Sequence, residues 1–243
     1  MTFELFDEDQ ESIKLAKDSG IQRVSFDSNG NTLYANWSVK DESYPSIFIV
    51  HGNGETLSDY VLTQLFLAES GYNTFVFDFS GFGSSEGVPT VEKLDEDAKN
   101  AWSKFCELSS KSSQQIAFGH SLGCAILLSS VNTYSTVPDD IIIHAPFSSA
   151  KEIAVHIGNA DESWAWILPD VWNNLENIQT IPTNNICVVH SVLDQVTPYK
   201  MSAEIAAQNK NSKLLLIDGY QHNSLYEPKK RKFWSEVLDY KRN

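Results

Sequence analysis

Residues 115–123, Gln-Ile-Ala-Phe-Gly-His-Ser-Leu-Gly, decide the fold. The apolar run 115–118 is typical of a buried strand, and an apolar segment of helix length begins at 122. Between them, residues 119–123 match G-x-S-x-G, in which a serine occupies a strained strand-to-helix turn and the glycines allow close approach of neighbouring elements. The ordinary alternative is a simple turn with Ser121 as a helix N-cap. The context favours an exposed, reactive serine.

Buried strands and helices alternate along most of the chain. Two alternating segments, 21–28 and 32–39, flank Asn29-Gly30 and predict a β-hairpin. Short runs that are apolar on both faces follow, separated by helix-length segments, which predicts an α/β fold with about eight mostly parallel strands flanked by helices. The runs are 47–50, 74–77, 115–118, 141–143, 186–189 and 214–217. The helices are expected at 57–70, 90–108, 122–131, 201–209 and 229–240.

Two stretches depart from this alternation. Residues 1–20 are polar and acidic, and predict a loose or helical leader before a single domain at 21–243. The interval from about 147 to 181 is too long for a simple crossover, and predicts either helices packed on the sheet edge or a small cap over a pocket. Its apolar residues are interpreted as pocket wall or as core; they are Trp164, Trp166, Ile167 and Leu168.

Four motifs occur in the order found in α/β hydrolases, and the sequence resembles this superfamily from about residue 21 onward. They are 51–54 (His-Gly-Asn-Gly), 78–85 (Asp-Phe-Ser-Gly-Phe-Gly-Ser-Ser), the G-x-S-x-G turn, and late acid and histidine loops. The chain looks most like monoacylglycerol lipases, lysophospholipases and acyl-protein thioesterases, and is also similar to serine aminopeptidases. The resemblance implies the α/β-hydrolase fold. Ser80 occupies the position of the family's arginine, so whichever group the arginine contacts in the family must have a different partner here. Asp78 is expected to be structural.

A serine hydroxyl is a weak nucleophile, so it needs a base to take its proton and a carboxylate to orient that base. The resemblance places the base at His222, after the last strand, and the acid at Asp194, in a segment similar to H-G-x-x-D-x-V-x-P. Ser191 occupies the glycine position of that segment. Asp218 is the competing acid, but it lies very close to the histidine loop and is interpreted as a strand end.

The expected reaction is hydrolysis of a carboxylic ester, or of a thioester, through an acyl-enzyme on Ser121. The oxyanion would be bound by the backbone N–H of Leu122, as the turn motif predicts, and by that of Asn53, as the resemblance implies. An amide or peptide hydrolase of the aminopeptidase type and a catalytically silent binding protein are the alternatives. The sequence has no paired metal-ligand spacing and no nucleotide-binding glycine motif, so neither a metal nor a cofactor is expected.

Charge and composition exclude several other classes. With 18 Lys+Arg against 32 Asp+Glu the net charge is -14, which disfavours binding to nucleic acid or anionic lipid. No apolar run approaches the roughly 18 residues of a membrane span, and no signal peptide is visible. Three widely spaced cysteines fit a reducing compartment, so a cytoplasmic location is expected. The expected partner is a small-molecule ester substrate, and the sequence does not indicate the oligomeric state. The acidic excess, concentrated in the leader and at 94–97, is interpreted as a solubilising surface.

Overall fold

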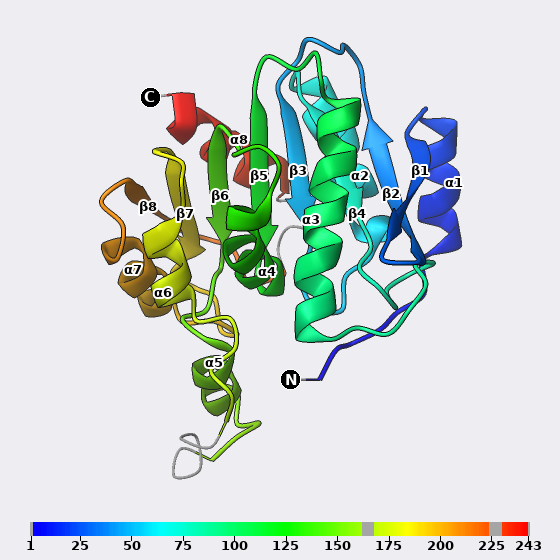
Figure 1. Cartoon of the computed structure of the whole chain (residues 1–243). Coiled ribbons are helices and arrows are strands. Elements are labelled where there is room, and N and C mark those ends of the chain that lie inside the picture. Colours follow the sequence, from blue (N-terminus) through cyan, green and yellow to red (C-terminus); the bar gives the residue numbers. More distant parts are fainter. Residues whose placement is uncertain (1, 162–167, 224–229, 243) are drawn as a thin grey trace.

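A computed structural model of the chain describes residues 2–161, 168–223 and 230–242. Its centre is an eight-stranded sheet in the order β1-β2-β4-β3-β5-β6-β7-β8 (Figure 1). Strands β1, β2 and β4 pair antiparallel, and the pairs from β4 through β8 are parallel. The strands are β1 (Gln22–Ser28), β2 (Asn31–Ser38), β3 (Ser46–Val50), β4 (Asn73–Phe77), β5 (Gln115–His120), β6 (Asp140–His144), β7 (Ile186–Ser191) and β8 (Ser212–Ile217).

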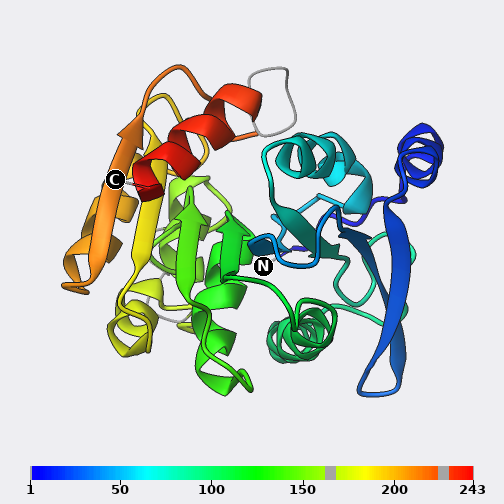
Figure 2. The same ribbon diagram turned by 90° about the horizontal axis from the view of Figure 1, so that it is seen from above.

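The central strands are buried on both faces because helices cover both sides of the sheet (Figure 2). Side chains of α3, α4 and α7 form the larger core on one face, and those of α2 and α8 form the core on the other. The helices are α1 (Gln10–Asp18), α2 (Leu57–Glu69), α3 (Val91–Leu108), α4 (Leu122–Ser130), α5 (Ala150–His156), α6 (Asn174–Asn177), α7 (Tyr199–Ala207) and α8 (Lys230–Arg242), with 3₁₀ turns η1 (Val131–Thr133) and η3 (Ile178–Thr180). This arrangement confirms the predicted fold class.

The parallel strands all end at the lower edge of the sheet in Figure 1, and α5 lies beyond that edge. Because loops that follow parallel strands meet at their carboxyl ends, this edge brings together residues that are far apart in the sequence. Helices α5 and α6 belong to the interval between β6 and β7. The predicted role of that interval as a cap, and the domain boundary at residue 21, stay predictions.

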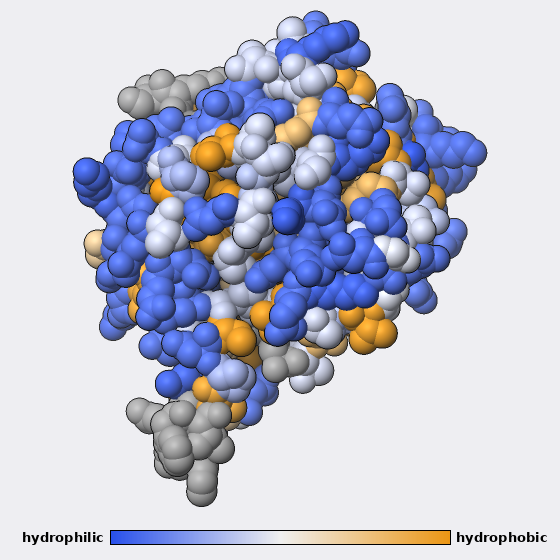
Figure 3. Space-filling view, in the orientation of Figure 1, coloured by the Kyte–Doolittle hydropathy of each residue, from blue (hydrophilic) through white to orange (hydrophobic). Residues whose placement is uncertain are grey.

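The face in Figure 3 is mainly hydrophilic, with apolar residues in separate small groups. However, not all of the acidic excess lies on the surface. Glu8 of the leader is buried against Arg23, and Asp97 is buried where it accepts hydrogen bonds from Ser28 Oγ at 2.6 Å and Ser80 N at 2.8 Å. The solubilising interpretation is therefore wrong for these two carboxylates, which stabilise the fold through local polar contacts.

No helix among the described residues has both the length and the apolar character that crossing a membrane requires.

Candidate active site

Ser121 occupies the sharp turn between β5 and α4. Its φ of 51° and ψ of -114° place a non-glycine residue in a strained conformation. The turn needs the glycine two residues later, since a Cβ on Gly123 would lie 2.0 Å from the carbonyl oxygen of Val50. The Ser121 side chain makes no capping hydrogen bond to α4. Ser121 thus holds the N-cap position of α4 without capping the helix through its side chain, and its half-buried hydroxyl is presented to the cavity.

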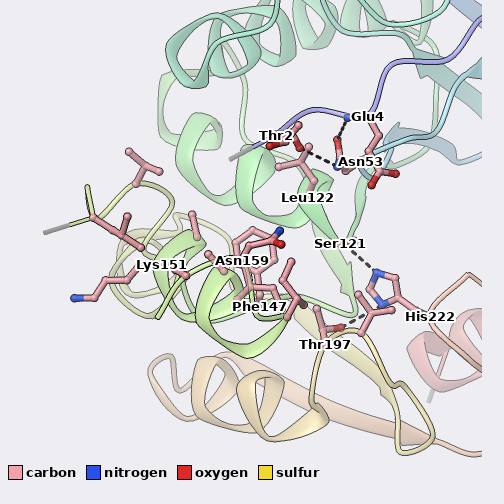
Figure 4. A pocket seen from close by; sticks show the side chains of 18 of the residues that line it. Thr2, Glu4, Asn53, Ser121, Leu122, Phe147, Lys151, Asn159, Thr197 and His222 are labelled. Carbon is pink, nitrogen blue, oxygen red and sulfur yellow. Dashed lines mark hydrogen bonds between the residues drawn. The ribbon is translucent and has the colours of Figure 1, made fainter. Parts of the chain in front are cut away.

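Three side chains that were predicted to act together meet beside this turn. His222 Nε2 lies 2.9 Å from Ser121 Oγ (Figure 4). On the other side of the ring, His222 Nδ1 lies 2.7 Å from Asp194 Oδ2. An ionised carboxylate only accepts, so the ring proton belongs on Nδ1. Nε2 is then left as an acceptor for the serine proton, which is the arrangement that nucleophilic catalysis needs. Asp218 is exposed at the end of β8, where its carboxylate accepts from the neighbouring Gly219 N–H.

The Asp194 carboxylate is held from several directions. Oδ1 accepts the backbone N–H groups of Val196 at 2.8 Å and Thr197 at 2.9 Å. Oδ2 accepts from Thr197 Oγ1 at 3.1 Å and lies 3.3 Å from His190 Nε2. Burial raises the pKa of Asp194, but the contacts with His190 and His222 outweigh burial and hold it well below its usual range. The carboxylate therefore stays ionised and fixed in orientation.

His222 is buried, with 8% of its surface exposed. Burial lowers its pKa, the Asp194 carboxylate raises it, and His120, whose ring centroid lies 5.0 Å away, lowers it further. The net pKa is below the ordinary value of 6.5. His222 is therefore a neutral base at neutral pH, as proton transfer from a serine requires.

The two expected oxyanion donors belong to residues on the cavity wall. Asn53 follows β3, Leu122 begins α4, and both line the cavity beside Ser121 (Figure 4). The Asn53 side chain is held by the leader, since Oδ1 accepts from Glu4 N at 3.1 Å and Nδ2 donates to the Thr2 carbonyl at 3.4 Å. Because these contacts occupy the side-chain amide of Asn53, its backbone N–H is the better candidate for binding the substrate.

The cavity that contains Ser121 and His222 has a volume of about 630 Å³. One wall is polar and consists of Thr2, Glu4, Asn53 and Glu55. The opposite wall is largely apolar and comes from α5 and the segments on either side of it. Its apolar members are Phe147, Ala150, Ile153, Ala154, Ile157, Leu168, Pro169 and Val171. A cavity of this size and mixed lining suits a small organic molecule with an apolar group.

Of the four residues predicted to bind substrate, Leu168 lines the cavity. The other three, Trp164, Trp166 and Ile167, lie outside the described residues. The prediction missed the polar wall formed by Thr2 and Glu4, because a polar leader gives no sequence signal of packing against a site. It also missed α5, whose apolar residues are too few to distinguish a cavity wall from ordinary core.

The loop 78–85 supports the site from outside the cavity. Asp78 is buried, and its Oδ1 accepts the Leu57 N–H at the start of α2 at 2.9 Å. Burial, and then the charge of Glu8, raise the pKa of Asp78 well above its usual value. Ser80 fills the arginine position and is tied through its backbone N–H to Asp97. These contacts give Asp78 the structural position expected for it. Among the described residues, no group of three or more His, Cys, Asp or Glu side chains is arranged to hold a metal ion.

Solved structures with this fold include an esterase and the protein Est1E. Esterase Pf2001 of Pyrococcus furiosus superposes with a TM-score of 0.74 at 15% identity, covering 98% of this chain and 95% of that one. Est1E of Butyrivibrio proteoclasticus, solved with ferulic acid bound, has a TM-score of 0.69 at 22% identity and covers 88% of this chain and 96% of that one. At such identities the likeness shows a common fold.

Sequence comparison finds distant relatives and a family. Lysophosphatidylserine lipase ABHD12 of Danio rerio is 27% identical over 223 residues, covering 79% of this chain and only 58% of the relative. The uncharacterized protein YfhR of Escherichia coli K12 is 24% identical over 210 residues, covering 83% of this chain and 73% of the relative. Residues 41–187 match the model of the hydrolase family described as serine aminopeptidase, S33. Because that match spans more than half of the chain, the protein belongs to this family of α/β hydrolases.

Proposed function

We propose that this chain hydrolyses carboxylic esters through an acyl-enzyme formed on Ser121. The observation that carries the proposal is the hydrogen-bonded series from Ser121 through His222 to Asp194, which opens into a cavity with an apolar wall. Membership of a hydrolase family supports the reaction class. The strained serine, the neutral base and the ionised acid supply the three chemical requirements of nucleophilic acyl transfer.

The reaction has two halves. Ser121 Oγ attacks the ester carbonyl carbon while His222 Nε2 takes the hydroxyl proton, and the N–H groups of Asn53 and Leu122 bind the oxyanion. Collapse of this intermediate breaks the bond to the alcohol oxygen, which receives the proton from His222. Water then attacks the acyl-enzyme, giving its proton to His222. The second collapse releases the carboxylic acid and returns the proton to Ser121.

The apolar wall indicates where an acyl group would bind. Phe147 and Ile153 are 3% and 6% exposed, so they form a fixed apolar surface that faces the cavity. Burial of each methylene there contributes roughly 0.8 kcal/mol, so affinity should rise with chain length until the cavity is full. A thioester would fit the same site, because the carbonyl chemistry is the same.

A second candidate, an aminopeptidase, is favoured by the exposed carboxylate of Glu4 on the polar wall, since a peptide amino terminus is a cation. A panel of p-nitrophenyl esters with two to twelve acyl carbons, assayed beside aminoacyl p-nitroanilides, separates the two proposals. Ester hydrolysis that increases with chain length supports the esterase. Hydrolysis of the anilides with little turnover of the esters would support the aminopeptidase and contradict the esterase.

Covalent labelling tests Ser121 as the nucleophile. A fluorophosphonate probe should label the wild type, and Ser121→Ala should abolish labelling and lower ester turnover by about a millionfold, because the nucleophile is absent. Intact-mass analysis locates the adduct, and Ser129→Ala is the matched control because its hydroxyl lies outside the cavity and bonds to Asp95. A folded wild type that fails to react would support a catalytically silent binding protein instead.

A further inference from the structure

A second group of polar residues lies buried behind the triad, and the reaction described above does not use it. Glu55, in the loop between β3 and α2, is 5% exposed at the cavity wall. His120, the last residue of β5, is fully buried, and so is Tyr60 of α2 apart from 1% of its surface. Burying a carboxylate costs free energy unless partners compensate its charge, so the buried position of Glu55 needs an explanation.

Glu55 joins three separate elements. Its Oε2 accepts the Gly52 N–H at 2.7 Å and the Tyr60 hydroxyl at 2.7 Å, and its Oε1 lies 3.2 Å from His120 Nε2. Burial raises the pKa of Glu55, but the His120 contacts and the Gly52 N–H outweigh it and hold the pKa below its ordinary value. His120 is supported in turn by His144 of β6, whose Nδ1 lies 2.9 Å from His120 Nδ1. The carboxylate is therefore ionised, with two hydrogen bonds to Oε2 and an ion-pair contact at Oε1.

The joined elements are the two sides of the oxyanion hole. Gly52 immediately precedes Asn53, and His120 precedes Ser121 and Leu122. A Cβ on Gly52 would lie 2.7 Å from Glu55 Oε1 and 3.1 Å from His120 Cδ2, so the carboxylate and the imidazole pack directly on this glycine. Glu55 thus contacts both chain segments that carry the expected donors, the Asn53 N–H and the Leu122 N–H.

We propose that Glu55 is a positioning residue that sets the spacing of the two oxyanion donors by linking Gly52, Tyr60 and His120. This inference rests on the proposed acyl transfer. Glu55 does not touch the reacting atoms; it acts through the backbone of the loop that follows β3. Because the oxyanion forms only in the intermediate and in the flanking transition states, loss of the link should reduce catalysis without reducing ground-state binding.

The test compares Glu55→Ala with Glu55→Gln. Removal of one oxyanion donor lowers the rate by about 10²–10³-fold, and displacement of a donor should cost only part of this factor. We therefore expect Glu55→Ala to lower kcat by about 10- to 100-fold with KM unchanged. Glu55→Gln keeps an oxygen acceptor for Gly52 and Tyr60, and should lose no more than about tenfold, since a neutral hydrogen bond is roughly half as strong as a charged one. Asp140→Asn, which changes a buried carboxylate at the amino end of β6 and outside the cavity lining, is the matched control and should keep wild-type kcat.

The inhibition constants of two matched ligands distinguish a positioning role from a purely structural one. An alkyl trifluoromethyl ketone adds to Ser121 and places an oxyanion in the hole, whereas the matching trifluoromethyl carbinol binds without addition. We expect Glu55→Ala to weaken ketone inhibition by the same factor as kcat/KM and to leave carbinol inhibition unchanged.

Either of two results would overturn the positioning role. One is a folded Glu55→Ala enzyme, checked by thermal melting, with wild-type kcat and ketone affinity. The other is equal weakening of ketone and carbinol, which would make Glu55 a substrate-binding wall. Failure of the proposed function itself is distinguishable, because the wild type would then not react with the fluorophosphonate.

Discussion

At the scale of single residues, the contacts of Asp194 explain which ring nitrogen of His222 carries the proton. Five groups surround this carboxylate, and Oδ2 faces His222 Nδ1 at 2.7 Å. In Asp194→Asn, an amide NH₂ at that position would donate to Nδ1 and force the proton onto Nε2, so His222 could not accept from Ser121. We expect kcat to fall by about 10³–10⁴-fold with little change in KM. Steady-state kinetics with a short ester measure this, and a loss below tenfold would contradict the assignment of Asp194.

The pH dependence of the reaction is also set at this scale. His222 works as a base only when neutral, and its pKa lies below 6.5. The acid limb of kcat/KM should therefore lie below pH 6.5, with activity kept above the limb and lost as the pH falls through it. Because the Asp194 charge raises the pKa of His222, the residual activity of Asp194→Asn should show a limb at still lower pH. A wild-type limb above pH 6.5 would rule out His222 as the buried base described here.

At the scale of elements, α5 and the residues beside it should set the acyl preference. Ile157, directly after α5, lines the cavity and is 48% exposed, so a charge there should not unfold the protein. We expect Ile157→Asp to lower kcat/KM for a dodecanoyl ester by about tenfold, since a carboxylate replaces an apolar contact surface, and to leave an acetyl ester unchanged. Val137→Asp, at a residue equally exposed but outside the cavity lining, is the control and should change neither. Equal effects on both esters would show that the acyl chain binds elsewhere.

The same elements show how much the sequence could predict. The strands from β3 to β7 were predictable because a strand buried on both faces is a continuous apolar run, and Ser121 was predictable because its turn requires glycines at fixed offsets. Glu55 was not, since its partners Tyr60 and His120 are brought to it only by the packing of α2 and β5. Thr2 and Glu4 were missed for a similar reason. Their contacts with Asn53 use backbone groups, which every residue type has.

At the scale of the whole molecule, the two cores lie on opposite faces of one sheet and leave its carboxyl edge free for chemistry. The residues that meet there come from loops as far apart as 53 and 222, so the site depends on the strand order β3-β5-β6-β7-β8. Fold class follows from a repeated local pattern, whereas the spacing of side chains within the site depends on how several elements pack at once. This difference is why the fold could be predicted more completely than the cavity.

The net charge of -14 acts at this largest scale, because the field of the whole surface affects how charged substrates approach. We expect octanoyl-coenzyme A, a polyanion, to show a lower kcat/KM at low salt than the neutral thioester octanoyl-N-acetylcysteamine, which carries the same acyl group. Raising the ionic strength from about 0.01 M to about 0.3 M shortens the Debye length several-fold, so the value for the coenzyme A thioester should rise several-fold while that for the neutral one stays constant. Kinetics of both thioesters across this range measure the difference. Equal values with no salt dependence would mean that the acidic surface plays no part in substrate choice, and that the cavity alone decides it.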